Sequence, residues 1–236
     1  IAQWLELLSD PTAAVELRAP KFNQGGGRKQ QTRSGFFDFD HLYDFARRSL
    51  AINRQAPGVY FTLNPVNRDL LSRRNNRDDI ADPGSLAHDK DIVARRWLLV
   101  DVDPVRPSDV SSTEAEKAAA LALIHSVRDH LATLGWPAPL LCDSGNGFHL
   151  LYRIDLPTDD GGQVKACLRA LAHKFDTPAV KVDRTVFNAS RICKVYGSKS
   201  RKGDSTAERP HRQSAILEIP HPIEIVSPEL IKALAE

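Results

Sequence analysis

The sequence of 236 residues contains no methionine, only three cysteines and no long run of apolar residues. No stretch approaches the ~20 consecutive apolar residues of a membrane-spanning helix, so an integral membrane protein is excluded and no membrane partner is expected. The three cysteines (Cys142, Cys167 and Cys193) form no C-x-x-C pair, which argues against a zinc ribbon or a secreted disulfide scaffold. Because no signal peptide opens the sequence, a cytoplasmic chain with reduced thiols is expected. The lack of methionine leads us to expect that Ile1 is a boundary within a longer protein.

Charge is divided unevenly along a chain whose overall composition, with 42% hydrophobic and 26% charged residues, is typical of globular proteins. Residues 97–160 contain four Lys or Arg against ten Asp or Glu, a net charge of −6. Residues 181–212 contain nine Lys or Arg against three Asp or Glu, a net charge of +6. Neighbouring acidic and basic blocks suit a site that holds both a metal ion and a polyanion, although two solvated faces would give the same counts.

The first 95 residues carry mixed patterns. The expected elements are a helix over 38–53, a strand over 58–64 and a basic loop or short helix over 68–90. The apolar side of that helix would consist of Leu42, Phe45, Leu50 and Ile52. The glycine-rich residues 23–34 are expected to form a mobile surface loop that could touch nucleic acid.

The patterns are stronger from residue 97 onward. Trp97 to Asp103 is apolar on both faces, which indicates a central strand, and Thr113 and Glu116 have the spacing of a helix capping box. Asn146 and Gly147 favour a tight hairpin turn in which both residues take positive φ. Further expected elements are strands over 139–143, 148–154, 180–183, 192–196 and 215–219, and helices over 161–174 and from Pro228. This order predicts an α+β fold with a mostly antiparallel sheet, similar to an RNA-recognition module.

Asp101 and Asp103 are the sharpest candidates for chemistry. Residues two apart on a strand point the same way, so both carboxylates converge on one place. Burying two like charges is costly unless a cation neutralises them, and carboxylate oxygens suit Mg²⁺ or Mn²⁺. Two surface aspartates at a strand end are the plain alternative. Asp183 follows another short apolar strand and matters only if the fold places it beside these two.

A glycine turn and a basic segment are the remaining candidates. The glycines of Ser144-Gly145-Asn146-Gly147 could direct backbone N–H groups at a phosphate, with Ser144 and His149 adding donors, or could form an ordinary hairpin. The basic segment suits a triphosphate or a nucleic-acid backbone, or is a solvated face. It consists of Arg191, Lys194, Lys199, Arg201, Lys202, Arg209, His211 and Arg212.

Taken in sequence order, three motifs resemble those of the archaeo-eukaryotic primase superfamily, and most closely those of its primase-polymerase branch of plasmids, phages and mobile elements. They are Asp101-x-Asp103, Ser144-Gly-x-Gly-x-His149 and the apolar-flanked Asp183. The resemblance implies that the three aspartates are catalytic and hold two divalent ions, Mg²⁺ or Mn²⁺. It assigns nucleotide binding to Ser144, Gly145, Asn146, Gly147, His149, Arg191 and Lys199. It also implies an N-terminal α/β subdomain over residues 1–95 packed against an RNA-recognition-like catalytic subdomain over 96–236.

The function implied is template-directed nucleotidyl transfer on single-stranded DNA, as primer synthesis, primer extension or both, from dNTPs or NTPs. A fused or associated helicase is a conceivable further partner. Tyr60 and Asn64 are candidates for the wall beside the nucleotide sugar. The residues expected to contact nucleic acid are Arg68, Arg73, Arg74, Arg201, Lys202 and Arg212. The alternatives are a non-catalytic nucleic-acid-binding module with a primase-like fold, a D-x-D glycosyltransferase and a two-metal nuclease.

Overall fold

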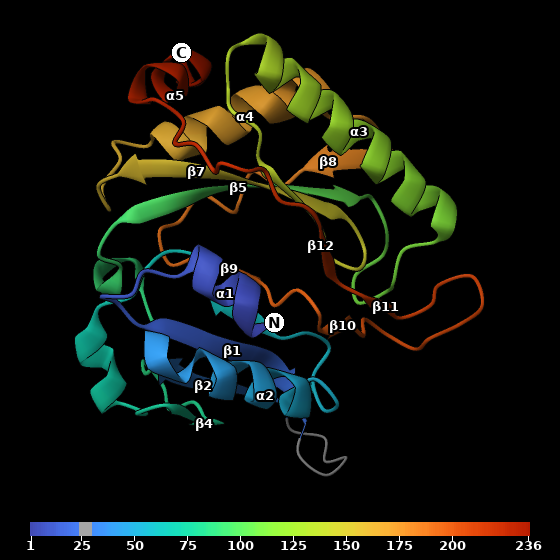
Figure 1. Ribbon diagram of the computed structural model, residues 1–236. Helices are drawn as coiled ribbons and strands as arrows, with labels where there is room; N and C mark the ends of the chain where they lie inside the picture. Colours follow the sequence, from blue (N-terminus) through green and yellow to red (C-terminus); the bar gives the residue numbers. More distant parts are fainter. Residues whose placement is uncertain (24–29) are drawn as a thin grey trace.

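Two antiparallel sheets, one above the other, form the framework of the computed structural model, which describes residues 1–23 and 30–236 (Figure 1). The upper sheet has the strand order β12-β6-β7-β5-β8 and the lower sheet the order β4-β2-β1-β3-β9. Every strand pair within these sheets is antiparallel. The predicted α+β class with mostly antiparallel pairing is therefore confirmed.

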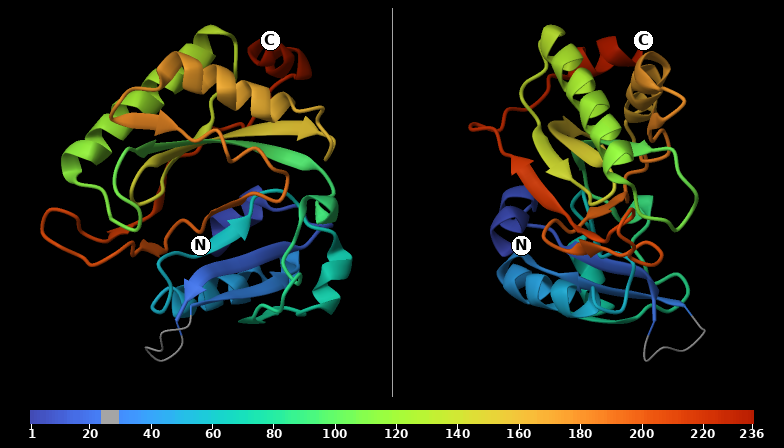
Figure 2. Two further views of the ribbon diagram at one scale, coloured as in Figure 1. Left: turned by 180° about the vertical axis from the view of Figure 1, so that it is seen from behind. Right: turned by 90° about the vertical axis from the view of Figure 1, so that its right-hand side faces the viewer.

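The upper sheet has the connectivity of an RNA-recognition module. Its elements are β5 (Arg95–Pro104), α3 (Glu114–Thr133), β6 (Leu140–Asp143), β7 (Phe148–Leu156), α4 (Gln163–Phe175) and β8 (Val180–Val182), followed by β12 (Ala215–Glu218) and α5 (Pro228–Ala235). The first six follow the order βαββαβ, with β5 and β7 in the middle of the sheet. Helices α3 and α4 cover one face, α5 packs on α4, and the other face is turned toward the lower sheet (Figure 2).

Local sequence accounts for these elements. Thr113 and Glu116 form the predicted capping box, in which each side chain accepts a hydrogen bond from the other residue's backbone N–H. Gly135 ends the helix region with a positive φ of 86°. The apolar residues Leu98, Val100 and Val102 are at most 1% exposed and anchor β5 between its two neighbours.

The lower sheet takes strands from both parts of the chain. Its elements are α1 (Ala2–Leu8), β1 (Val15–Phe22), β2 (Gln31–Phe37), α2 (Leu42–Ile52), β3 (Tyr60–Thr62), β4 (Arg77–Ile80) and β9 (Ile192–Lys194). Strand β9 lies between β8 and β12 of the upper sheet in sequence, yet it pairs with β3 of the lower sheet. The division at residue 95 stays a prediction, and β9 is the segment of 96–236 that completes the lower sheet.

Several local predictions need correction. Leu50 points outward from α2 and is 51% exposed, whereas Ser49 is buried in its place. Of the predicted loop over 23–34, residues 24–29 lie outside the described residues and 31–34 belong to β2, where backbone pairing with β1 favours a strand. Strand β4 lies within the polar residues 68–90. None of the helices that the structure describes is long and apolar enough to cross a membrane.

The predicted backbone of the hairpin turn is also wrong. Positive φ occurs at Gly145, with a value of 99°, and at neither Asn146 nor Gly147. The loop between β6 and β7 is four residues long and is closed by the Ser144 N–H, which donates to the Gly147 carbonyl at 3.0 Å. A four-residue loop has other φ requirements than the two-residue turn that the Asn-Gly pair predicts.

Candidate active site

A cavity of about 430 Å³ lies between the two sheets. Its volume is within the range of small-molecule sites. Asp101, Asp103 and His149 line it from the upper sheet, and Tyr60 and Lys194 line it from β3 and β9 of the lower sheet. The site therefore depends on the packing of the two sheets.

The fold brings the three sequence-predicted carboxylates to this cavity. Asp101 and Asp103 are on β5, and Asp183 directly follows β8, which pairs with β5. The Asp183 N–H donates to the Asp101 carbonyl at 2.8 Å, which ties the end of β8 to the middle of β5. In this structure Asp183 Oδ1 accepts hydrogen bonds from the Thr185 N–H at 2.7 Å and from its hydroxyl at 2.8 Å.

His149 on β7 is the cross-strand partner of Asp101. Its Nε2 lies 3.4 Å from Asp101 Oδ1, outside good hydrogen-bond geometry. Burial raises the pKa of Asp101, but His149 and the charges of Lys202 and Arg191 together lower it overall. Burial lowers the pKa of His149, but Asp101 and Cys193 together raise it overall. The two groups therefore favour an ionised pair. Burial, together with the Asp101 charge, raises the pKa of Asp103.

The chemistry of these donors fits a divalent cation. Asp101 Oδ1 is buried and accepts no hydrogen bond from any residue that the structure describes. A buried carboxylate oxygen without a donor is costly, and a hard cation such as Mg²⁺ or Mn²⁺ would satisfy it. Within 1–23 and 30–236, no group of three or more His, Cys, Asp or Glu side chains is already arranged to hold a metal ion.

The Ser144–Gly147 turn is held by its own hydrogen bonds. The Gly145 N–H donates to Asp143 Oδ1 at 2.7 Å, and the Gly147 N–H donates to Ser144 Oγ at 3.1 Å. The two glycine N–H groups are thus engaged inside the turn, while Ser144 and Asn146 line the cavity. The Asn146 amide is buried and bridges two other segments, because it accepts from the Ser112 N–H and donates to Ser200 Oγ.

Four cations line the cavity: Lys21, which pairs with Asp109 at its edge, and Arg191, Lys194 and Lys202. Arg191 donates to the Thr185 carbonyl at 2.5 Å, while its buried Nε contacts no acceptor among the described residues. Lys194 is 4% exposed, and its ammonium lies 5.4 Å from the centre of the Tyr60 ring. Burial and the nearby charge of Lys202 lower the pKa of Lys194 to about 7. The cavity thus presents carboxylates from β5 and the end of β8, and cations from the segment 191–202.

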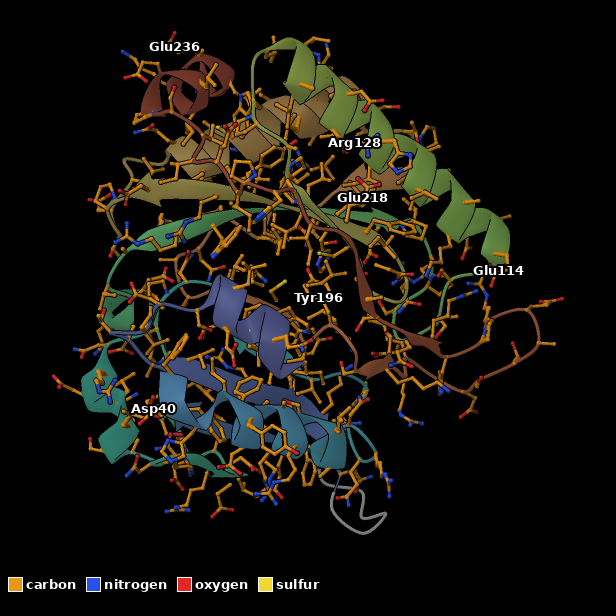
Figure 3. All side chains as sticks on the ribbon, viewed as in Figure 1. Asp40, Glu114, Arg128, Tyr196, Glu218 and Glu236 are labelled. Atoms are coloured by element: carbon orange, nitrogen blue, oxygen red, sulfur yellow. The ribbon has the colours of Figure 1, made fainter. Side chains whose placement is uncertain are left out.

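The other basic candidates lie outside the cavity lining. Arg212 pairs with Glu114 at 2.6 Å and donates to the Ser112 carbonyl, and Figure 3 shows Glu114 at the start of α3. Arg74 is buried against Asp82 and the Ile80 carbonyl. Arg68 begins a 3₁₀ helix (Arg68–Ser72) and Arg73 directly follows it. Lys199 is in β10 (Lys199–Ser200), which pairs with β11 (Arg212–Gln213), and Arg201 directly follows β10.

No protein-family model and no curated protein matches this chain. Among solved structures, the chain is similar to the crystal structure of primase RepB', with a TM-score of 0.54 over 98% of this chain. The fold is similar to that of a primase. The sequences are 12% identical, and the match spans 59% of that protein's chain. At this identity the similarity concerns the fold, and the function has to be argued from the cavity.

Two cavity residues, Lys194 and Tyr60, are not among the catalytic and nucleotide-binding residues that the family resemblance assigns. Lys194 belongs to the basic segment, but only its place on β9 and its burial distinguish it from its neighbours. Tyr60 lines the cavity, whereas Asn64, the other candidate for the sugar wall, is buried and binds backbone groups of Arg96 and Ala189. A sequence signal existed for Tyr60 as a strand aromatic, but not for its orientation.

Proposed function

We propose that this chain catalyses template-directed nucleotidyl transfer on single-stranded DNA, as primer synthesis, primer extension or both. The observation that carries the proposal is the cavity, in which the three aspartates Asp101, Asp103 and Asp183 face the same space as Arg191, Lys194 and Lys202. Phosphoryl transfer depends on charge neutralisation and positioning, and carboxylates for metal ions beside cations for phosphates match this need. The primase-like fold supports the same reaction class. The primase-polymerase branch is part of the proposal and rests on the order of the sequence motifs.

The aspartates would hold two divalent ions, Mg²⁺ or Mn²⁺. Asp101 and Asp103 are fixed by β5 in the centre of the sheet, and the orphaned Asp101 oxygen is the best-prepared ligand. When bound, such ions activate the primer hydroxyl and neutralise the triphosphate and the leaving pyrophosphate. The chain's own contribution is to keep the carboxylates within one partly enclosed cavity, where electrostatic interactions are stronger than in bulk water.

The nucleotide would lie between the Ser144–His149 segment and the cations of 191–202. Ser144, Asn146 and His149 line one side, and Arg191 with Lys194 the other. The buried ammonium of Lys194 forms no ion pair with any described residue and makes only a long contact, 3.4 Å, to the Lys199 carbonyl. A phosphate group is the partner that such a cation needs. The turn glycines then shape the loop, since their N–H groups are engaged within it.

The partners proposed from this chemistry are a DNA template and primer and dNTPs or NTPs. The family resemblance adds a fused or associated helicase. A cytoplasmic location is proposed with them, in keeping with three buried, unpaired cysteines. Tyr60 is the candidate for contact with the sugar, because its ring lines the cavity.

The test is nucleotide incorporation on single-stranded DNA, with and without an annealed primer, with Mg²⁺ or Mn²⁺, and with dNTPs and NTPs separately. Product that requires metal and is lost in Asp101→Ala/Asp103→Ala supports the proposal, and product without primer adds primase activity. His149→Ala is expected to raise the nucleotide KM more than the template Kd. No product while template still binds would instead support the non-catalytic binding module, and degradation of the DNA would support a nuclease.

A further inference from the structure

His149, Tyr196 and Cys193 form a cluster of buried side chains, of which His149 and Cys193 line the cavity. The Tyr196 hydroxyl lies 2.7 Å from His149 Nδ1 and 3.2 Å from Cys193 Sγ. His149 is 5% exposed, and Tyr196 and Cys193 are each 1% exposed. Cys193 Sγ itself lies 3.7 Å from His149 Nδ1. These three groups form a small polar network that fills the space on the Nδ1 side of the imidazole.

The network defines which edge of the imidazole is available to a ligand. Nδ1 is taken by Tyr196, while Nε2 is on the edge that faces Asp101 and the cavity. A hydroxyl can donate to an unprotonated Nδ1 and accept from the Cys193 thiol, or accept from a protonated Nδ1 and donate to the sulfur. In both arrangements Nδ1 has a partner. Nε2 carries a proton that it can donate into the cavity when the ring is neutral in the first arrangement, or doubly protonated in the second.

Tyr196 is itself held by the lower lobe, which consists of the lower sheet with helices α1 and α2. Its carbonyl accepts a hydrogen bond from Trp4 Nε1 at 3.0 Å, and its ring meets the Trp4 ring edge-on with centroids 5.5 Å apart. Trp4 belongs to α1, and Figure 3 shows Tyr196 beside α1, below the upper sheet. His149, which belongs to the upper sheet, thus contacts a side chain that is anchored to the lower lobe.

We propose that Tyr196 is a positioning residue for His149, and that its hydroxyl keeps the imidazole turned so that Nε2 donates to a phosphate oxygen of the nucleotide. This inference rests on the proposed function of the cavity. Tyr196 touches neither the cavity nor the nucleotide in this scheme and acts only through His149. Cys193 completes the cluster, because its Sγ lies near both the Tyr196 hydroxyl and His149 Nδ1.

Tyr196→Phe tests this role, with Tyr152→Phe as the matched control. Tyr152 is also 1% exposed and is on β7 three residues after His149, but its hydroxyl forms no hydrogen bond with any described residue. Tyr196→Phe is expected to raise the nucleotide KM about tenfold, the scale of one buried hydrogen bond, and to leave the template Kd unchanged. Tyr152→Phe is expected to change neither value. In a double variant with His149→Ala, Tyr196→Phe is expected to cause no further rise in the nucleotide KM.

A second readout does not depend on activity. The ¹⁵N resonances of the His149 ring report which nitrogen carries the proton, and Tyr196→Phe is expected to change them while Tyr152→Phe leaves them as in the wild type. Cys193→Ser, which keeps a donor and acceptor beside the hydroxyl, should resemble the wild type. Unchanged ¹⁵N resonances and KM in Tyr196→Phe would overturn the positioning role while the proposed function stands. If the wild-type protein incorporates no nucleotide but its ring resonances respond to Tyr196→Phe alone, the positioning of His149 is supported and the proposed function fails.

Discussion

Gly147 lies so close to Asp103 that a β-carbon on the glycine would stand 2.4 Å from Asp103 Oδ1 and 2.2 Å from the Val102 carbonyl oxygen. The β6–β7 turn therefore packs against the strand that carries the two paired carboxylates. The absence of a side chain at residue 147 permits this approach, and it links the position of the turn to that of the Asp103 carboxylate.

Gly147→Ala is expected to displace Asp103 and to abolish nucleotide incorporation, because backbone atoms on β5 cannot move aside without disturbing the sheet. The comparison is with Gly161→Ala, whose glycine has a φ of 60° and no atom within 4 Å of an added β-carbon. Gly161→Ala should lose about 1 kcal/mol of stability from left-handed strain and keep its activity. Equal incorporation by the two variants in the primer-extension assay would contradict the proposed link.

Adding Mg²⁺ or Mn²⁺ is expected to stabilise the folded chain through the aspartates. At an ion concentration about 100 times the Kd, binding contributes about 2.7 kcal/mol, which corresponds to a rise in Tm of about 5–10 °C. Asp101→Asn and Asp103→Asn should lose this rise in thermal melts. Asp129→Asn, an exposed aspartate on α3, should keep it. A rise of the same size in all four proteins would place the ion elsewhere.

Nucleotide binding is expected to take up a proton at Lys194. With a pKa of about 7, the Lys194 side chain is mostly the neutral amine at pH 8. A bound triphosphate raises that pKa because it stabilises the charged ammonium form. Calorimetric titration at pH 8 in two buffers of different protonation enthalpy should show an uptake approaching one proton relative to Lys194→Met. At pH 5.5 Lys194 is already charged, so the uptake should disappear. Lys174→Met, at an exposed site on α4, should behave as the wild type.

Acid should remove a specific part of the stability of the lower lobe. The buried Asp78 on β4 pairs with Arg33 and Arg48, and although burial raises its pKa, the hydrogen bonds of Arg48 and Arg33 lower it overall. Asp78→Asn is expected to cost about 3 kcal/mol in urea unfolding at pH 7. The stability difference between the wild type and Asp78→Asn has its full size above about pH 4, where Asp78 is ionised in the unfolded chain as well. It is lost as the pH falls through the pKa of Asp78 in the folded state, which is lower.

Asp79→Asn is the matched control for that measurement. Asp79 is the next residue on β4, its side chain is 57% exposed, and it is 3.8 Å from Arg77. An exposed ion pair of this kind contributes little to stability. The free energy of unfolding of the variant should therefore stay within about 0.5 kcal/mol of the wild-type value, both at pH 7 and in acid. If Asp78→Asn lost as little as Asp79→Asn, the buried ion pair would not stabilise this lobe.

The local elements could be predicted from the sequence because their causes lie within a few residues of one another. The capping box of Thr113 and Glu116 needs only a spacing of three, and the shared direction of Asp101 and Asp103 needs only the alternation of a strand. Strand β5, helix α3 and the β6–β7 hairpin were all expected for such reasons. The φ values of the turn were not, because the length of the loop decided them.

The tertiary structure alone decided which distant residues share a cavity. Asp183 reaches Asp101 because β8 pairs with β5, and Lys194 faces the aspartates because β9 joins the lower sheet instead of the upper one. The partners of the arginines were decided in the same way, as Arg212 pairs with Glu114 across 98 residues of sequence. Sequence patterns record side-chain type and local spacing, whereas strand order and the packing of the two sheets set the distances between segments that are far apart in the chain.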